Sequence, residues 1–267
     1  MAGVTAAVGT TLAGALAGKH CLVMGVQNRW SIAYAIAEGM AAAGGRIAVT
    51  YVDDRAKRDA DALVAEHPGA AGYACNVESD EELDALGDAL GRDFGRVDAL
   101  VHSIGFAPVA ELQGRFLDTS REGWRMTMSV SAYSLVAAAQ RVAPLMTDGG
   151  SILTLTYLGA DRVFPRYNVM GVAKAALESS VRYLAADLGE QRVRVNAISA
   201  GPIKTAAARG IPGFGDMHGT LLERAPIKEP FGAAQVVGTA VFLASDASSA
   251  ITGETLFVDN GYHAMGM

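Results

Sequence analysis

Hydrophobic positions along the chain follow two alternating patterns. Short apolar runs rich in β-branched residues are typical of buried parallel strands, and longer segments with apolar residues three or four positions apart are typical of helices. The pattern predicts seven strands, at His20–Met24, Arg46–Tyr51, Ala71–Cys75, Val97–His102, Ser151–Thr156, Val193–Ile198 and Glu254–Val258. It predicts helices at Ser31–Ala43, Asp54–Glu66, Ser79–Phe94, Thr119–Met146 (long enough to contain a break), Tyr167–Leu188 and Ala233–Ser245.

This order of elements predicts an α/β fold. Strands that alternate with helices form a parallel sheet with helices on both faces, and right-handed crossovers make it doubly wound. No repeat or linker divides the chain, so we expect a single domain at residues 12–267 after a poorly ordered extension at residues 1–11. Residues 201–228 are rich in glycine and proline, and a loop of this length is usually functional, so we expect a substrate loop there.

Composition narrows the classes of function. The formal net charge of −6 disfavours a general nucleic-acid binder. The chain has no run of 18 apolar residues and no basic segment typical of a signal peptide, so we expect neither a membrane span nor secretion. Cys21 and Cys75 form no metal-ligand spacing, which predicts no metal site and a reducing, cytoplasmic setting.

Small residues follow the first predicted strand, where a doubly wound fold binds its ligand. Gly25, Ser31 and Ala33 let the loop pack on the start of the next helix, whose free N–H groups can hold a pyrophosphate. The segment does not match GxGxxG, and an ordinary strand–helix turn with Ser31 as the helix N-cap is an equally good interpretation.

Polar side chains follow the next strands. Asp53 and Asp54 favour NADH over NADPH, because carboxylates repel a 2′-phosphate, although the pair also fits a helix N-cap. Asn76 and Val77 are placed to meet an adenine edge, and Gly105 lets backbone pass close to a cofactor.

Three further residues follow or end later strands. His102 stands alone, and such a histidine is more often structural than catalytic. After the sixth strand, Ile203 is placed to pack on a nicotinamide and Thr205 to bond its carboxamide or a phosphate, although a plain turn and helix cap also fit.

Tyr167 and Lys174 carry the strongest chemical signal. Seven residues make about 700°, close to two helical turns, so both side chains lie on one helix face. A phenol can stabilise a developing enolate, and an ammonium can bind ribose hydroxyls and lower the pKa of the phenol. A core tyrosine and a surface lysine can have the same spacing, so the spacing alone does not distinguish a catalytic pair from a structural one.

Four motifs in order resemble the NADH-dependent enoyl-[acyl-carrier-protein] reductase family from about Leu16 onward. They are Gly25 with Ser31-Ile32-Ala33, then His102-Ser103-Ile104-Gly105-Phe106-Ala107-Pro108, then Tyr157…Tyr167…Lys174, and finally Asn196-Ala197-Ile198-Ser199-Ala200-Gly201-Pro202-Ile203. The six residues between Tyr167 and Lys174 discriminate this family from carbonyl-reducing relatives, in which three residues separate the pair.

The resemblance implies a Rossmann fold and NADH-dependent reduction of an enoyl thioester on acyl carrier protein. Tyr167 would bond the thioester carbonyl, Lys174 would bind the nicotinamide ribose, and Tyr157 would line the acyl pocket with Phe106 and Ala107. It also implies a homotetramer and a mobile loop at about residues 206–222. The implied cofactor contacts are Gly25, Ser31, Ile32, Asn76, Val77, Ser103, Ile104, Gly105, Lys174, Ile203 and Thr205.

Two positions depart from the family pattern. Asn76 stands where an aspartate near adenine is usual, and Val52 stands where a polar residue is common. A reductase of ketones or xenobiotic enones, and an NADH-binding sensor without turnover, remain alternative hypotheses.

Overall fold

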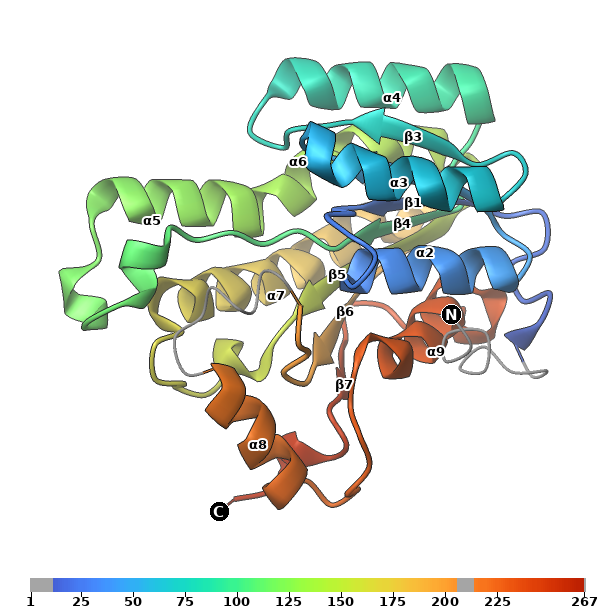
Figure 1. Ribbon diagram of the computed structural model, residues 1–267. Helices are drawn as coiled ribbons and strands as arrows, with labels where there is room; N and C mark the ends of the chain where they lie inside the picture. Colours follow the sequence, from blue (N-terminus) through green and yellow to red (C-terminus); the bar gives the residue numbers. More distant parts are fainter. Residues whose placement is uncertain (1–11, 206–213, 267) are drawn as a thin grey trace.

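The computed structural model describes residues 12–205 and 214–266, and the predicted N-terminal extension lies outside them. Its centre is one sheet of seven parallel strands in the order β3-β2-β1-β4-β5-β6-β7 (Figure 1). The strands are β1 His20–Met24, β2 Arg46–Tyr51, β3 Ala71–Ala74, β4 Ala99–His102, β5 Gly150–Thr156, β6 Val193–Ala200 and β7 Thr255–Val258. The predicted doubly wound parallel sheet is therefore confirmed.

Two apolar cores, one on each face, hold helices against the sheet. One core contains buried residues of α2 (Ile32–Ala42), α3 (Asp54–Glu66) and α9 (Ala233–Ala244). The other contains residues of α4 (Asp80–Phe94), α6 (Ser134–Val142) and α7 (Asn168–Leu188). Because both faces are covered, the central strands β1, β4 and β5 are buried almost throughout, which explains their continuous apolar runs, whereas the edge strands β3 and β7 are only partly buried.

Polar side chains begin the helices where the sequence places them. The side chains of Ser31, Asp53 and Ser79 accept hydrogen bonds from backbone N–H groups in the first turns of α2, α3 and α4. Each satisfies a donor that the helix itself leaves unpaired. The cap interpretations of Ser31 and Asp53 are thus confirmed, and the three helices start at the carboxyl edge of the sheet.

The strand order reverses between β1 and β4, and this is the point where doubly wound folds bind ligands. The segments that leave these two strands, at residues 25–31 and 103–107, face each other across it. The five central strands carry most of the predicted site residues at their carboxyl ends.

Two predicted segments differ from the structure. The long helix over Thr119–Met146 is divided into α5 (Arg121–Met128), a π-helical turn (Ser129–Tyr133) and α6. The predicted loop at residues 201–228 contains a helix, α8 (Phe214–Arg224), which forms despite the glycines at 215 and 219. Residues 206–213 of the predicted mobile loop lie outside the described chain.

Within the two described ranges, no helix has the length and apolar character that a membrane span requires.

Gly39 sets the distance between α2 and α9, and an alanine there should destabilise the fold. A Cβ atom at Gly39 would lie 2.1 Å from Cγ1 of Val237, a fully buried and stiff β-branched residue. We expect Gly39→Ala to lower the free energy of unfolding by about 1–3 kcal/mol, measured by chemical denaturation.

The matched control is Gly91→Ala in α4, where the new Cβ would meet only Leu145 at an ordinary 3.6 Å. This change should leave the free energy of unfolding unchanged or raise it by about 0.5–1 kcal/mol. Equal destabilisation by both variants would contradict the packing argument.

Candidate active site

Gly25 brings the end of β1 against the segment that follows β4. Its φ is +93°, and a Cβ atom there would lie 2.4 Å from the carbonyl oxygen of Ser103 and 3.1 Å from the Ile104 side chain. The Gly25 N–H donates to Thr50 Oγ1 at 3.1 Å. Conformation and space both require glycine here, and its absence of a side chain lets the segment after β4 pack directly on the end of β1.

Lys174 is buried at the carboxyl edge of the sheet, with 7% of its surface exposed. Its Nζ donates to the carbonyl oxygen of Leu155 in β5 at 2.7 Å. Burial lowers the pKa of Lys174 to about 8, and the negative charge of Glu178 opposes this shift. The ammonium is therefore held inside the protein and not in bulk water, which excludes the surface lysine that the spacing left open.

Gly105 lies beside this ammonium. An ideal Cβ built on Gly105 would be 3.5 Å from Lys174 Nζ and 4.0 Å from Ser131 Oγ. The backbone after β4 thus passes close to the charged group, as expected for a wall of a cofactor site. The same segment touches Gly25 at its other end, through Ser103.

Tyr167 lies just before α7 and not inside it. Its neighbours Arg166 and Asn168 have φ angles of +66° and +41°, a region that non-glycine residues adopt rarely. The Asn168 side chain donates to the carbonyl oxygen of Glu111 at 3.2 Å, which helps to hold this conformation. The predicted helix Tyr167–Leu188 is thus confirmed with its start one residue later, and a strained turn at this start positions Tyr167.

Tyr157 and Tyr167 form an aromatic pair above the end of β5. Their ring centroids are 5.1 Å apart in an edge-to-face arrangement, and Phe164 lies 5.0 Å from Tyr157 on another side. Gly159 permits this packing, because a Cβ there would lie 2.5 Å from the Tyr167 ring. The structure thus brings together the two predicted catalytic tyrosines.

Burial raises the pKa of both tyrosines, so both are protonated hydrogen-bond donors at neutral pH. We expected Lys174 to lower the pKa of Tyr167, and this expectation is wrong. The pKa of Tyr167 is instead raised, because burial desolvates the phenol. Neither phenolic oxygen has a hydrogen-bond partner among the residues that the structure describes, and neither is fully enclosed.

His102 is structural, as expected. It is fully buried, with one ring nitrogen 3.0 Å from Thr154 Oγ1 and the other 2.8 Å from Ser134 Oγ. Burial, with a contribution from the Lys174 charge, lowers the pKa of His102 to about 3. The neutral ring links β4 to β5 and to α6 and exchanges no proton near neutral pH.

The other predicted contacts lie at the ends of neighbouring strands. Asn76 Oδ1 accepts from the Glu78 N–H at 3.1 Å, and Val77 is buried beside it. Ala107 packs with Leu112 in a small apolar cluster, whereas Phe106 is 49% exposed.

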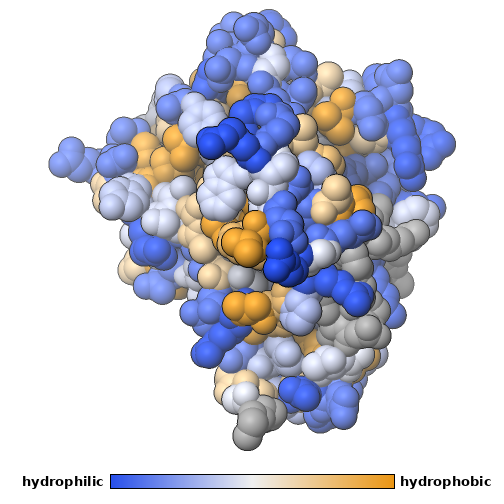
Figure 2. All heavy atoms as spheres, turned by 90° about the vertical axis from the view of Figure 1, so that its left-hand side faces the viewer, coloured by the Kyte–Doolittle hydropathy of each residue, from blue (hydrophilic) through white to orange (hydrophobic). Residues whose placement is uncertain are grey.

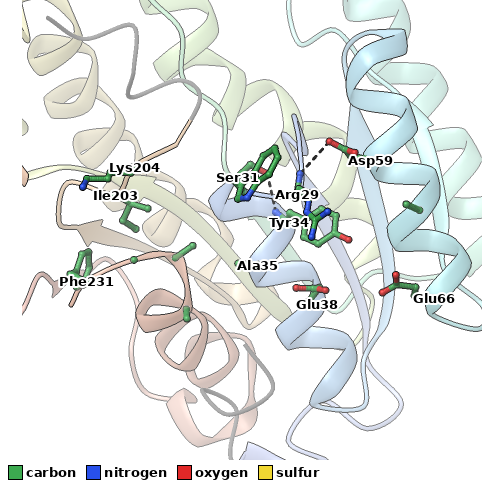
Figure 3. Close-up of a pocket in the computed structure, with 15 residues that line it drawn as sticks. Arg29, Ser31, Tyr34, Ala35, Glu38, Asp59, Glu66, Ile203, Lys204 and Phe231 are labelled. Carbon is green, nitrogen blue, oxygen red and sulfur yellow. Dashed lines mark hydrogen bonds between the residues drawn. The ribbon is translucent and has the colours of Figure 1, made fainter. Parts of the chain in front are cut away.

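A cavity of about 500 Å³ opens beside the start of α2, between α3 and the segment that leads to α9 (Figure 3). Of the predicted site residues only Ser31 and Ile203 line it, and the tyrosines and Lys174 lie outside it. We therefore locate the chemistry by the buried side chains and not by this cavity. Sequence reasoning assigned no ligand to the other lining residues, among them Arg29, Trp30, Tyr34, Lys204 and Phe231, because they share no motif.

These features, a doubly wound sheet with a glycine-requiring turn at its switch point, a lysine buried against β5 and a pair of packed tyrosines after the same strand, define a dinucleotide-binding oxidoreductase. The family model described as enoyl-(acyl carrier protein) reductase matches residues 25–263. The chain belongs to this family.

Individual relatives agree along nearly the whole chain. The Rhizobium meliloti enoyl-[acyl-carrier-protein] reductase [NADH] 1 is 49% identical over 95% of this chain and 93% of its own. The Bacillus cereus enoyl-acyl carrier protein reductase, solved with NADP+ and indole naphthyridinone, has a TM-score of 0.92 at 45% identity and covers 94% of this chain and 98% of its own. The Anaplasma phagocytophilum enzyme, solved with NAD, has a TM-score of 0.89 at 41% identity and covers 95% of each chain.

The buried ammonium should make NADH binding depend on pH. The pKa of Lys174 is lowered to about 8, so the charged form, to which we assign the ribose hydroxyls, is lost as pH rises through 8. We expect the Kd for NADH to be constant below about pH 7 and to increase by up to about tenfold per pH unit above pH 8. Fluorescence titration with NADH from pH 6 to 9.5 measures this.

Lys174→Met retains most of the side-chain length and removes the charge. It should bind NADH more weakly at pH 7 and show no further weakening above pH 8. The same pH dependence in both proteins would contradict the assignment.

Proposed function

We propose that this chain reduces the trans-2 double bond of an enoyl thioester carried on acyl carrier protein, with NADH, during fatty-acid elongation. One observation carries the proposal. In a member of this family, Tyr167 and Tyr157 pack together at the strand edge at which the buried Lys174 ammonium lies.

The residues present fit a dinucleotide. The turn at Gly25 has no space for a side chain, and the start of α2 offers N–H groups to a pyrophosphate. Lys174 provides a buried cation for ribose hydroxyls, next to Gly105. When bound, a reduced nicotinamide supplies the hydride that adds to C3 of the enoyl group. The residues assigned to cofactor contact are Gly25, Ser31, Ile32, Asn76, Val77, Ser103, Ile104, Gly105, Lys174, Ile203 and Thr205.

Tyr167 acts on the thioester oxygen. Addition at C3 places negative charge on that oxygen as an enolate, and a fixed O–H donor stabilises this charge in a site that excludes water. Because burial raises its pKa, the phenol keeps its proton and donates a hydrogen bond. Tyr157, Phe106 and Ala107 form the side of the site assigned to the acyl chain.

The preference for NADH rests on Asp53. Its side chain caps α3 by accepting from the Ala56 N–H at 2.7 Å, which fixes a carboxylate two residues after β2. A 2′-phosphate at the end of β2 would meet this negative charge. Relatives solved or described with NAD and NADP+ both exist, so the choice has to come from residues of this chain.

Both cysteines are free thiols, and both are buried. This fits a reducing compartment, so we assign the activity to the cytoplasm. Activity confined to an extracytoplasmic fraction of fractionated cells would refute the assignment.

A spectrophotometric assay with crotonyl and acetoacetyl thioesters tests the proposed reaction. We expect NADH oxidation with the crotonyl substrate, slower oxidation of NADPH, and none with the keto substrate. Tyr167→Phe should lower kcat by about 10²–10³-fold, because it removes one oxyanion donor, with the Kd for NADH within about threefold of wild type.

Tyr183→Phe, on the exposed side of α7, is the control and should keep full activity. Activity on the keto substrate alone would favour a carbonyl reductase. Tight NADH binding without turnover of any thioester would favour a sensor.

We also propose a homotetramer, supported by apolar surface on one side of the molecule. Figure 2, which faces the side that carries α5, shows apolar patches between polar side chains. Exposed residues of α5 and the neighbouring segments include Val109, Leu117, Trp124, Tyr133 and Val163. Sedimentation equilibrium should give a mass four times that of one chain. A monomer at micromolar concentration would contradict this proposal.

A further inference from the structure

The segment Ser103–Phe106 connects two parts of the proposed cofactor site, the turn at Gly25 and the Lys174 ammonium. At one end the Ser103 carbonyl oxygen lies directly against Gly25, and at the other Gly105 lies against the Lys174 ammonium. Any displacement of this segment would change the space at both ends together. The segment forms no helix or strand, so something outside it has to hold its position.

Ser131 is the side chain that holds it. Its Oγ donates to the carbonyl oxygen of Phe106 at 2.8 Å and accepts from the Phe106 N–H at 2.8 Å. The side chain is fully buried, so water cannot replace these bonds easily. One hydroxyl thus fixes both backbone polar groups of a single residue.

The π-helical turn at Ser129–Tyr133 explains how a helix can offer this hydroxyl. Such a turn inserts one residue and shifts the direction of the side chains that follow. Ser131 faces the segment after β4, while Ser134, which follows the turn, bonds His102 at the end of β4. Residues of this irregular turn and the start of α6 therefore bond both the last residue of β4, His102, and Phe106, which follows that strand.

We propose that Ser131 is a positioning residue for the cofactor. By fixing Phe106, it holds the Ser103–Phe106 segment where Gly25 and Lys174 contact one dinucleotide together. The proposal rests on the cofactor site assigned above. Without the tether, the segment adopts further positions, and NADH binds only the fraction of molecules in which the segment is in place.

The test compares NADH with 5′-AMP on Ser131→Ala. AMP occupies only the adenosine end, at β2 and β3, away from Gly105 and Lys174. We expect the Kd for NADH to rise about five- to thirtyfold, as for the loss of two hydrogen bonds, and the Ki for AMP to change by less than twofold. Ser131→Thr, which retains the hydroxyl, should recover most of the affinity.

Ser180→Ala is the matched control. It removes a helical serine hydroxyl that bonds only the Ala176 carbonyl at 2.9 Å, and it should leave both constants unchanged. If Ser131→Ala does not fold, Ser131→Cys keeps the volume, weakens both bonds and should shift the NADH Kd in the same direction.

Unchanged NADH affinity in the folded variant would overturn the proposal, and so would equal weakening of NADH and AMP, which indicates general loss of structure. Failure of the wild-type protein to bind NADH would instead overturn the cofactor site itself. The two failures are therefore distinguishable.

Discussion

The structure depends on one buried ammonium group. A charged lysine inside a protein is unfavourable unless it meets good acceptors, and Lys174 has one backbone carbonyl, that of Leu155, at hydrogen-bond distance. Glu178, one helical turn further along α7, adds an attractive charge but is itself bonded to Thr156. An ammonium has three donors, so hydroxyl groups of a bound ribose would complete its coordination.

The rest of the site is arranged around that group. The β1–β4 switch point brings Gly25 and the segment after β4 into contact, and the same segment continues to the ammonium. The strained turn before α7 sets Tyr167 beside Tyr157. The end of β4 and the segment after it are fixed by hydrogen bonds, because Ser134 bonds His102 and Ser131 bonds Phe106. Rigid neighbours on every side suit a site that has to hold a flexible dinucleotide in one conformation.

Most of the fold could be predicted from the sequence, because its strands and helix starts are marked by residues close together in the chain. Strands buried on both faces give apolar runs, and the capping side chains of Ser31, Asp53 and Ser79 mark helix starts. The burial of both Tyr167 and Lys174 could not be read from their spacing, which a core tyrosine and a surface lysine share. The left-handed residues that flank Tyr167, Arg166 and Asn168, carry no glycine signal, so only tertiary contacts reveal them.

Other parts of the site depend on contacts between distant segments. Nothing in the pattern distinguishes Ser131 from the other serines of a helical segment, and its role follows from a π-helical turn that periodicity does not show. The raised pKa of Tyr167 likewise follows from its burial in the folded chain, which the spacing does not show.

A crystal structure of the chain with NAD+ and an enoyl thioester analogue would test the roles of Lys174 and Tyr167. We expect Lys174 Nζ within about 3 Å of the hydroxyls of the nicotinamide ribose, and the Tyr167 hydroxyl at a similar distance from the thioester oxygen. A ribose bound away from Lys174, with its Nζ still bonded only to Leu155, would contradict these roles.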